Sequence, residues 1–253
     1  EVPLVLAGDD TLVFRYDPAR AESREARLLV DAAIQAAAGG TRPVPVVHDT
    51  ERVRGSRYID WLVPGLIGLN LMSTGMWGIG FGIVYMRQKK QLKRLIATPM
   101  RRSDFLLAQI LFRLVFLVLE IPPIMLFAWL VFDVQVAGSL LLLLAVIVLG
   151  SLTFSGLGLL AAARARTIEG VSGINNLIML PMFVLSGIFF SASRFPDVMQ
   201  PFIRLLPLTA LNDAMRVIYN EGLGLASIMS EVAILTLWTA GSFAVALKLF
   251  RWQ

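Results

Sequence analysis

The stretch GSLLLLLAVIVLGSLTFSGLGLLAAA, residues 138–163, decides the fold. It holds no charged side chain, and a helix of about 20 mostly apolar residues is long enough to cross the hydrocarbon layer of a membrane. A basic residue, Arg164, follows it directly. The stretch therefore predicts a transmembrane helix.

Four further segments of the chain have the same length and apolar character. In all, the expected spans are 59–86, 104–132, 138–163, 170–191 and 227–248. The composition agrees, because 57% of the 253 residues are hydrophobic, mean hydropathy is +0.71 and only 16% of residues are charged. A soluble domain has about 25% charged residues, so this chain is not a soluble globule. We predict an all-α polytopic membrane protein.

Residues 1–57 differ from the rest and are expected to form a small α+β domain. They contain no apolar run of 20 residues, and they hold 8 Lys/Arg against 9 Asp/Glu. The third β-type run contains two prolines, so we expect it at an edge of the sheet. The expected elements are strands at 2–6, 11–16 and 42–48 and a helix at 20–38.

The segment 192–226, between the last two spans, is semi-apolar and is interrupted by three prolines. It contains no clean run of 20 apolar residues, so we expect short re-entrant half-helices at one membrane face. The whole transmembrane domain is expected at 58–253. The chain begins at Glu1 in strand-like sequence, and we expect a further membrane helix to precede it.

Basic residues alternate between the expected loops. The loop after the first span holds seven Lys or Arg, the next loop holds none, and the third holds Arg164 and Arg166. Cytoplasmic loops are enriched in Lys and Arg, so the first and third loops and the C-terminus are predicted to be cytoplasmic. Residues 1–57 and 192–226 are then extracytoplasmic.

The common signatures of enzymes and metal sites are absent from this sequence. It has no cysteine, His48 is its single histidine, and the phosphate-binding pattern G-x-x-x-x-G-K-[ST] does not occur. The basic excess lies in the membrane part, where it has a topological meaning, so we expect no nucleic-acid partner. We therefore predict that the chain is not an enzyme and binds no cofactor itself.

The loop 87–107, RQKKQLKRLIATPMRRSDFLL, combines a basic cluster with an amphipathic pattern. Residues 88–97 predict a short helix that exposes an apolar face beside its positive charges. This loop either contacts anionic lipid or docks on a cytoplasmic partner. The residues expected to dock are Lys89, Lys90, Leu92, Lys93, Arg94, Leu95, Ile96, Thr98 and Pro99.

Two motifs resemble one known family. The loop 87–107, with its Leu-x-x-Leu-x-Ala-Thr-Pro core, resembles the cytoplasmic coupling segment of type-2 ATP-binding-cassette (ABC) exporter permeases, although the E-x-x-x-G-T often seen there is missing. The second motif, within 185–216, is similar to the family's signature around two extracytoplasmic half-helices. Its residues are Ser186, Gly187, Phe195, Pro196, Pro207 and Arg216.

The resemblance implies a half-transporter in the plasma membrane of a prokaryote, which is the inner membrane of a Gram-negative cell. Two permease subunits, identical or different, would pair among membrane lipids with two cytoplasmic ABC ATPases that bind ATP and magnesium. The substrate is expected to be hydrophobic or amphipathic: a drug, a lipid or a lipid-linked glycan. The alternatives are a secondary transporter, which tends to carry internal repeats, and a non-transporting scaffold, which needs no coupling helix.

Polar residues within the expected spans are candidates for the substrate path. Glu120 lies mid-span, where a carboxylate is costly and usually faces protein or water, and Arg113 is two turns earlier on the same face. The alternative is that Arg113 reaches the inner membrane edge while Glu120 is protonated or paired elsewhere. Asn175 and Asn176 either line the path or form hydrogen bonds between helices.

Small residues repeat along the first span. Gly68, Gly75 and Gly82 are spaced seven residues apart, and Gly78 lies four residues before Gly82. Small residues allow helices to approach closely. These glycines are therefore expected at a helix contact, either inside one subunit or between two subunits.

Overall fold

The computed structural model describes residues 4–8, 11–16, 21–37, 46–50, 57–96, 102–189 and 195–249. Contacts between residues divide the chain into two units, Glu1–Trp61 and Leu62–Gln253. The division falls in the first turn of helix α2, which begins at Tyr58. Each unit has its own architecture.

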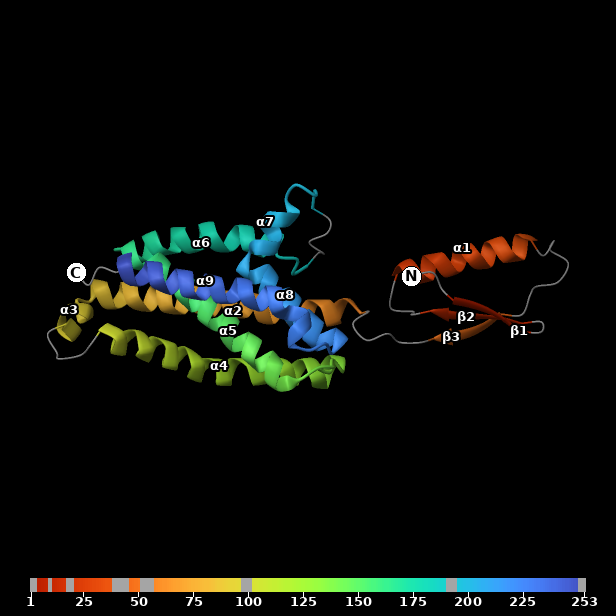
Figure 1. The fold of residues 1–253 in the computed structure, drawn as a ribbon, viewed down its shortest axis with the longest axis horizontal. Helices are drawn as coiled ribbons and strands as arrows, with labels where there is room; N and C mark the ends of the chain where they lie inside the picture. Colours follow the sequence, from red (N-terminus) through yellow and green to blue (C-terminus); the bar gives the residue numbers. More distant parts are fainter. Residues whose placement is uncertain are drawn as a thin grey trace. The chain divides into compact units, whose positions relative to one another are not determined.

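The first unit contains a three-stranded sheet and one helix (Figure 1). Strand β1 (Leu4–Gly8) pairs antiparallel with β2 (Thr11–Tyr16), and β2 pairs in parallel with β3 (Val46–Thr50). Helix α1 (Ala21–Ala37) connects β2 to β3, because parallel neighbours need a crossover connection. These elements overlap the four expected ones, and residues 1–3 and 38–45, which include the expected starts of the first and third strands, lie outside the described residues.

The second unit is a helical bundle. Among the described residues, five helices are long and apolar enough to cross a membrane, as the sequence predicts. The fourth span ends at Leu185 rather than 191, because the backbone of Gly187 adopts the left-handed conformation with φ 67°. The five helices are α2 (Tyr58–Gln88), α4 (Arg102–Phe132), α5 (Leu140–Arg164), α6 (Ile168–Leu185) and α9 (Met229–Leu249).

Between α6 and α9 the chain forms short helices instead of a span. Helices α7 (Gln200–Leu205) and α8 (Pro207–Arg216) are followed by a π-helix, Val217–Glu221, and a 3₁₀-helix, Leu225–Ile228. Proline is well tolerated at the first residue of α8, since that position needs no intrahelical N–H bond. Two short helices therefore stand where the sequence predicts re-entrant half-helices, and nine of the ten residues of α8 are buried.

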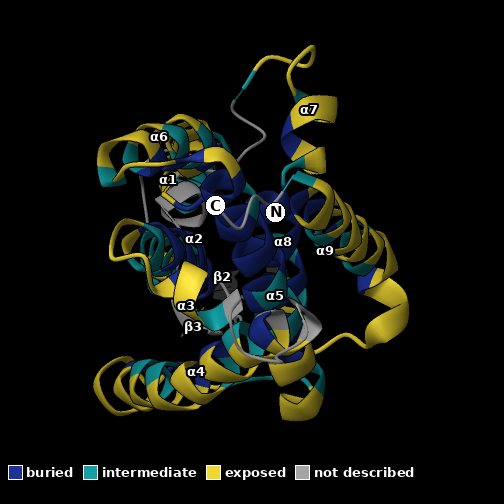
Figure 2. Ribbon diagram, turned by 90° about the vertical axis from the view of Figure 1, so that its left-hand side faces the viewer, coloured by how far each residue is buried: buried dark blue, intermediate teal, exposed yellow. Residues whose placement is uncertain are grey.

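The centre of the bundle is formed by α2, α5 and α8, whose buried residues gather there in Figure 2. In the most apolar windows of α2 and α5, 56% of residues are buried, against 17% in α4, α6 and α9. The outer three helices therefore present most of their apolar side chains to the membrane. Such exposure is expected in lipid, which is as apolar as the side chains themselves.

Small residues bring α2 and α5 into close contact. A methyl group added at Gly158 would stand 2.8 Å from the carbonyl oxygen of Gly75, and one added at Gly75 would stand 2.8 Å from Phe154 Cβ. By contrast, Gly78 and Gly82 face open space. The glycines of α2 thus divide between a face that packs inside the subunit and a face that is uncovered.

Candidate functional site

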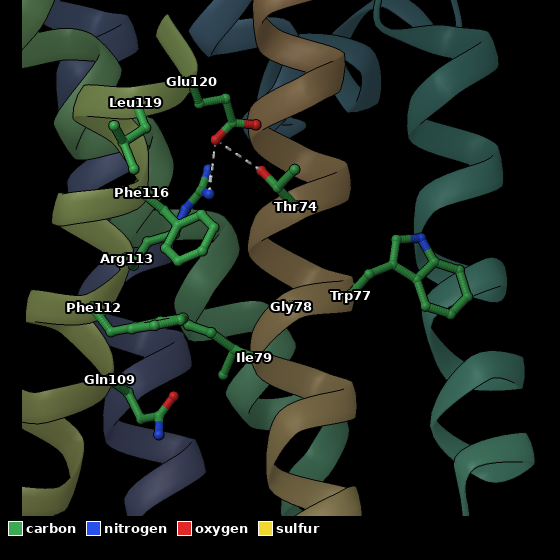
Figure 3. Close-up of a pocket in the computed structure, with 10 residues that line it drawn as sticks. All are labelled: Thr74, Trp77, Gly78, Ile79, Gln109, Phe112, Arg113, Phe116, Leu119 and Glu120. Carbon is green, nitrogen blue, oxygen red and sulfur yellow. Dashed lines mark hydrogen bonds and ion pairs between the residues drawn. The ribbon is translucent and has the colours of Figure 1, made fainter.

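A cavity of about 650 Å³ lies between α2 and α4 (Figure 3). Small-molecule pockets have volumes of about 300–1,000 Å³ and are mostly apolar with a few polar groups, and this cavity fits that description. The residues that line it are Thr74, Trp77, Gly78, Ile79, Gln109, Phe112, Arg113, Phe116, Leu119 and Glu120.

Three polar residues of the cavity, Arg113, Glu120 and Thr74, form a network that joins three helices. Arg113 Nη1 donates to Glu120 Oε2 at 3.0 Å, and Arg113 Nε donates to Ser151 Oγ on α5 at 2.8 Å. Thr74 Oγ1 on α2 lies 3.5 Å from the same Glu120 oxygen. Figure 3 shows Arg113, Glu120 and Thr74 converging in the space between α4 and α2.

This network lies deep in the expected membrane layer. At 1.5 Å per residue, Glu120 is about 20 Å along the helix from Leu107 and about 18 Å from Phe132, the two ends of that span. The side chains of Arg113 and Glu120 are 6% and 15% exposed. A charge at this depth is costly unless it is paired. Arg113 is bound to Glu120. The alternative interpretation, in which Arg113 reaches the inner membrane edge and Glu120 is paired elsewhere, is therefore wrong.

The two asparagines of α6 do not line this cavity. Asn175 is buried, and its Nδ2 donates to the backbone oxygen of Met76 at 3.3 Å, which joins α6 to α2. Asn176, the next residue of the same helix, is exposed. Of the three expected path residues, only Glu120 is a wall of this cavity. Asn175 instead forms a hydrogen bond between helices, the other role that the sequence allowed.

The expected docking helix is shorter than the sequence predicts. Helix α2 continues to Gln88, and α3 (Gln91–Ile96) has only six residues. Between them the backbone of Lys90 adopts the left-handed conformation with φ 55°, so the prediction of one continuous helix over 88–97 was wrong. The exposed basic residues of this turn and helix are Lys89, Lys90, Lys93 and Arg94. The turn and α3 together are called the basic turn below.

The expectation that this helix exposes its apolar face was also wrong, at Leu92. Leu92 is 1% exposed and belongs to a hydrophobic cluster of the chain itself, against which Leu95 is partly packed. The side chain of Ile96 and the whole of Thr98 and Pro99 lie outside the described residues. The cluster draws on five long helices through Ile79, Ile83, Val84, Phe105, Leu159, Ala161, Ala162, Val171 and Ala246, together with Ala165.

Arg87 binds the end of a neighbouring helix. Its Nη1 donates to the backbone oxygen of Ala162 at 2.9 Å and also to that of Ala165. The last carbonyl groups of a helix lack intrahelical partners, and a positive charge beside them is favourable. Sequence reasoning counted Arg87 only among the loop's basic residues, although its position at the very end of a span was a usable signal.

Arg216 joins α8 to the end of α6. Its Nη2 donates to the backbone oxygen of Gly187 at 2.6 Å, and Asn212 Nδ2 donates to that of Ser186 at 3.3 Å. Burial lowers the pKa of Arg216 to about 10, while its neighbour Asp213 acts in the opposite direction. The guanidinium therefore remains charged at neutral pH and can hold the turn after α6 in place.

The other residues of the second motif lie apart from this contact. Pro207 is buried at the start of α8, whereas Phe195 is half-buried and Pro196 is exposed before α7. The backbone oxygen of Phe195 accepts a hydrogen bond from Gln200 Nε2 at 3.0 Å. The motif thus contains one connected group around Arg216 and one turn that leads into α7.

A family model described as "ABC-2 type transporter" matches residues 29–220, a range that includes the cavity and the basic turn. The chain belongs to the ABC-2 type transporter family. This confirms the predicted family, and it makes the chain a multi-pass membrane permease, a transport subunit rather than an enzyme. The alternatives of a secondary transporter and a membrane scaffold are not supported by this match.

Several curated proteins are similar to this ABC-2 permease. Nodulation protein J of Bradyrhizobium diazoefficiens is 25% identical over 201 residues, which cover 79% of this chain and 76% of that protein. Inner membrane transport permease YadH of Escherichia coli K12 is 22% identical over 204 residues, with the same coverage of 79% and 76%. ABC transporter G family member 20 of Dictyostelium discoideum is 28% identical over 186 residues, or 72% of this chain, but the match spans only 25% of that longer protein.

Proposed function

We propose that this ABC-2 permease is the membrane subunit of an ATP-driven exporter and that it couples to a separate cytoplasmic ABC ATPase, the subunit that binds ATP and magnesium. The observation that carries the proposal is the basic turn at the end of α2. Its lysines and arginine are exposed, while Leu92 within it is buried in a cluster shared by five helices. An acidic surface of a partner is attracted to such a turn, and a displacement of the turn acts on the whole cluster.

The way in which α3 is held supports this coupling role. A helix of six residues is not stable alone in water, so α3 depends on its contacts with the bundle. Leu92 supplies an anchor in the cluster, and Arg87, just before the turn, binds the end of α5. A partner that displaces α3 therefore acts on α2 and α5, the two most buried of the long helices.

A second permease subunit fits the uncovered face of α2. Figure 2 shows α2 between α4 and α6, with both outer helices largely exposed. Gly78 and Gly82 face open space there, and Tyr85 is 51% exposed. Small residues on a membrane helix favour close approach of another helix. We therefore assign this face to the contact with a second permease and place the substrate path beside it.

The orientation follows from the exposed charges. Arg87 reaches the end of α5, so the basic turn and the exposed residues Arg164 and Arg166 lie at the same end of the bundle. Under the positive-inside rule this end is cytoplasmic, and α8 and the unit Glu1–Trp61 are extracytoplasmic. We place the protein in the plasma membrane of a prokaryote. The apolar cavity walls favour a hydrophobic or amphipathic substrate.

Charge reversal tests the docking surface. The double variant Lys93→Glu/Arg94→Glu is compared with Arg166→Glu/Lys248→Glu, which reverses two exposed charges elsewhere at the cytoplasmic end. Both are co-expressed with the candidate ATPase. We expect the first variant to lose ATPase co-purification and substrate-stimulated hydrolysis, and the second to keep both. Equal behaviour of the two variants would show that α3 is not the docking site.

Accessibility of single cysteines tests the orientation. A cysteine at Lys90 should react with an impermeant thiol reagent only after the membrane is opened, whereas one at Asp31 should react on intact cells. The chain has no native cysteine, so the background is low. Labelling of both positions from outside would contradict the five-span topology.

A further inference from the structure

We propose that the cavity between α2 and α4 binds an uncharged amphipathic molecule by a carbonyl-type oxygen and that Arg113 is the hydrogen-bond donor. This inference rests on the proposed transport function and deepens it by naming a ligand class. It assigns Arg113 a role in ligand selection that the sequence did not suggest.

The guanidinium of Arg113 has a donor group left over. Nε is used by Ser151 and Nη1 by Glu120, whereas Nη2 is buried and has no hydrogen-bond partner among the described residues. Arg113 is 5% exposed and lines the cavity. A buried donor without a partner is unfavourable, so an acceptor that enters the cavity makes a hydrogen bond that the protein alone does not make.

The ion pair determines which charge the ligand carries. The positive charge of Arg113 is already balanced by Glu120 at 3.0 Å, so the polar network has no net charge. A carboxylate that approached Nη2 would lie close to the Glu120 carboxylate, and like charges repel strongly where the effective dielectric constant is low. A ketone, ester or amide oxygen accepts the same hydrogen bond without that repulsion.

The walls of the cavity favour an apolar body behind this oxygen. Ile79 stands on the α2 side, and Phe112, Phe116 and Leu119 stand on the α4 side (Figure 3). The ester groups of bulk phospholipid lie in the interfacial layer, whereas Glu120 lies near mid-span. An acyl chain that fills the cavity brings no acceptor. The site therefore selects a guest molecule with its own internal carbonyl group.

Benzophenone is a suitable probe, because it is an uncharged diaryl ketone that cross-links to nearby C–H bonds under near-ultraviolet light. The full chain is reconstituted in phosphatidylcholine nanodiscs, irradiated with the probe and analysed by peptide mass spectrometry. We expect labels on the α2 and α4 peptides that line the cavity. The ketone 9-fluorenone should compete at least about tenfold better than the hydrocarbon diphenylmethane, the difference that one hydrogen bond to a charged donor makes.

Removal of the negative charge should reverse the preference for uncharged ligands. In Glu120→Gln the charge of Arg113 is unbalanced, so labelling by the anion 4-benzoylbenzoate should rise about tenfold or more relative to benzophenone. Asp133→Asn removes the same charge from an exposed position after α4 and should leave this ratio unchanged. In the double variant Arg113→Gln/Glu120→Gln, the advantage of 9-fluorenone over diphenylmethane should disappear.

A gain in labelling by the anion cannot result from misfolding, so the charge variant gives a clear outcome. An unchanged probe ratio in Glu120→Gln, or labels confined to peptides outside α2 and α4, would overturn the proposal. The nanodiscs contain no ATPase. Failure here therefore leaves the docking assignment intact, and loss of docking leaves this result intact.

Discussion

Leu92 gives the most direct test of how α3 is attached to the bundle. The side chain is 1% exposed and lies in the same cluster as Ile83, Phe105 and Ala162. Replacing a buried leucine by alanine removes apolar contacts and leaves a void, at a cost of about 2–5 kcal/mol. Because α3 has only six residues and no independent stability, most of this cost weakens its attachment to the bundle.

Limited digestion with trypsin measures this attachment. The turn and helix contain Lys89, Lys90, Lys93 and Arg94, which a protease cleaves efficiently only when the segment opens. When opening is fast compared with cleavage, the cleavage rate follows the population of the open form. A loss of about 3 kcal/mol raises that population roughly a hundredfold, so Leu92→Ala should be cut about a hundred times faster than the wild type at this segment.

Two control variants separate local opening from general damage. Leu247→Ala changes a leucine in the last turn of α9 that is 56% exposed and should leave the cleavage rate unchanged. Leu95→Ala, at a half-buried position, should give a smaller increase than Leu92→Ala. If Leu92→Ala is cut at the wild-type rate, Leu92 does not hold α3, and the argument that α3 transmits a displacement to the bundle fails.

Three further substitutions, two of them paired with a control variant, test the packing of the bundle. Gly158→Val should prevent accumulation of folded protein, because the added side chain meets the backbone of α2, whereas Gly241→Ala on α9 faces open space and should give the wild-type peak in size-exclusion chromatography. Asn175→Leu should lower the midpoint of thermal unfolding because it removes a buried hydrogen bond worth about 1 kcal/mol, and Asn176→Leu should not. Arg216→Lys should also lower that midpoint, since an ammonium group lacks the planar fork that contacts two partners; an unchanged midpoint would refute its bridging role.

The spans were predictable from sequence because the length of an apolar run belongs to one segment alone. Their ends were less predictable. The fourth span stops six residues early, at Leu185, because Gly187 adopts a backbone conformation that apolar content does not encode. Likewise, the left-handed residue in the basic turn is Lys90, a residue type that gives no warning of such a conformation.

The periodicity around Leu92 shows why faces are easier to predict than partners. The spacing correctly identified an apolar face on the segment that became α3. It contained no information on what covers that face, because the covering residues lie up to 154 positions later, at Ala246. An apolar face beside lysines was interpreted as a surface for another protein, whereas the chain covers it with its own helices.

The polar network illustrates the same limit within the candidate site. Arg113 and Glu120 are seven residues apart on one helix face, so their proximity was visible in the sequence. The contributions of Ser151 and Thr74 come from two other helices and depend on how those helices pack. The unused donor of Arg113, on which ligand selection depends, exists only because Ser151 and Glu120 occupy the other two nitrogens.

The hydrophobic cluster that holds Leu92 and the cavity share one residue, and this connects the two proposals. Ile79 belongs to the hydrophobic cluster that holds Leu92, and it is also a wall of the cavity. Phe105, in the same cluster, lies in the first turn of α4, the helix that carries Arg113 two turns further on. Because packed side chains interlock rather than flow past one another, a displacement of α3 by a partner must repack the cluster around Ile79. That repacking changes the shape of the cavity next to the Arg113 donor, and ligand bound there changes in turn how firmly α3 is held.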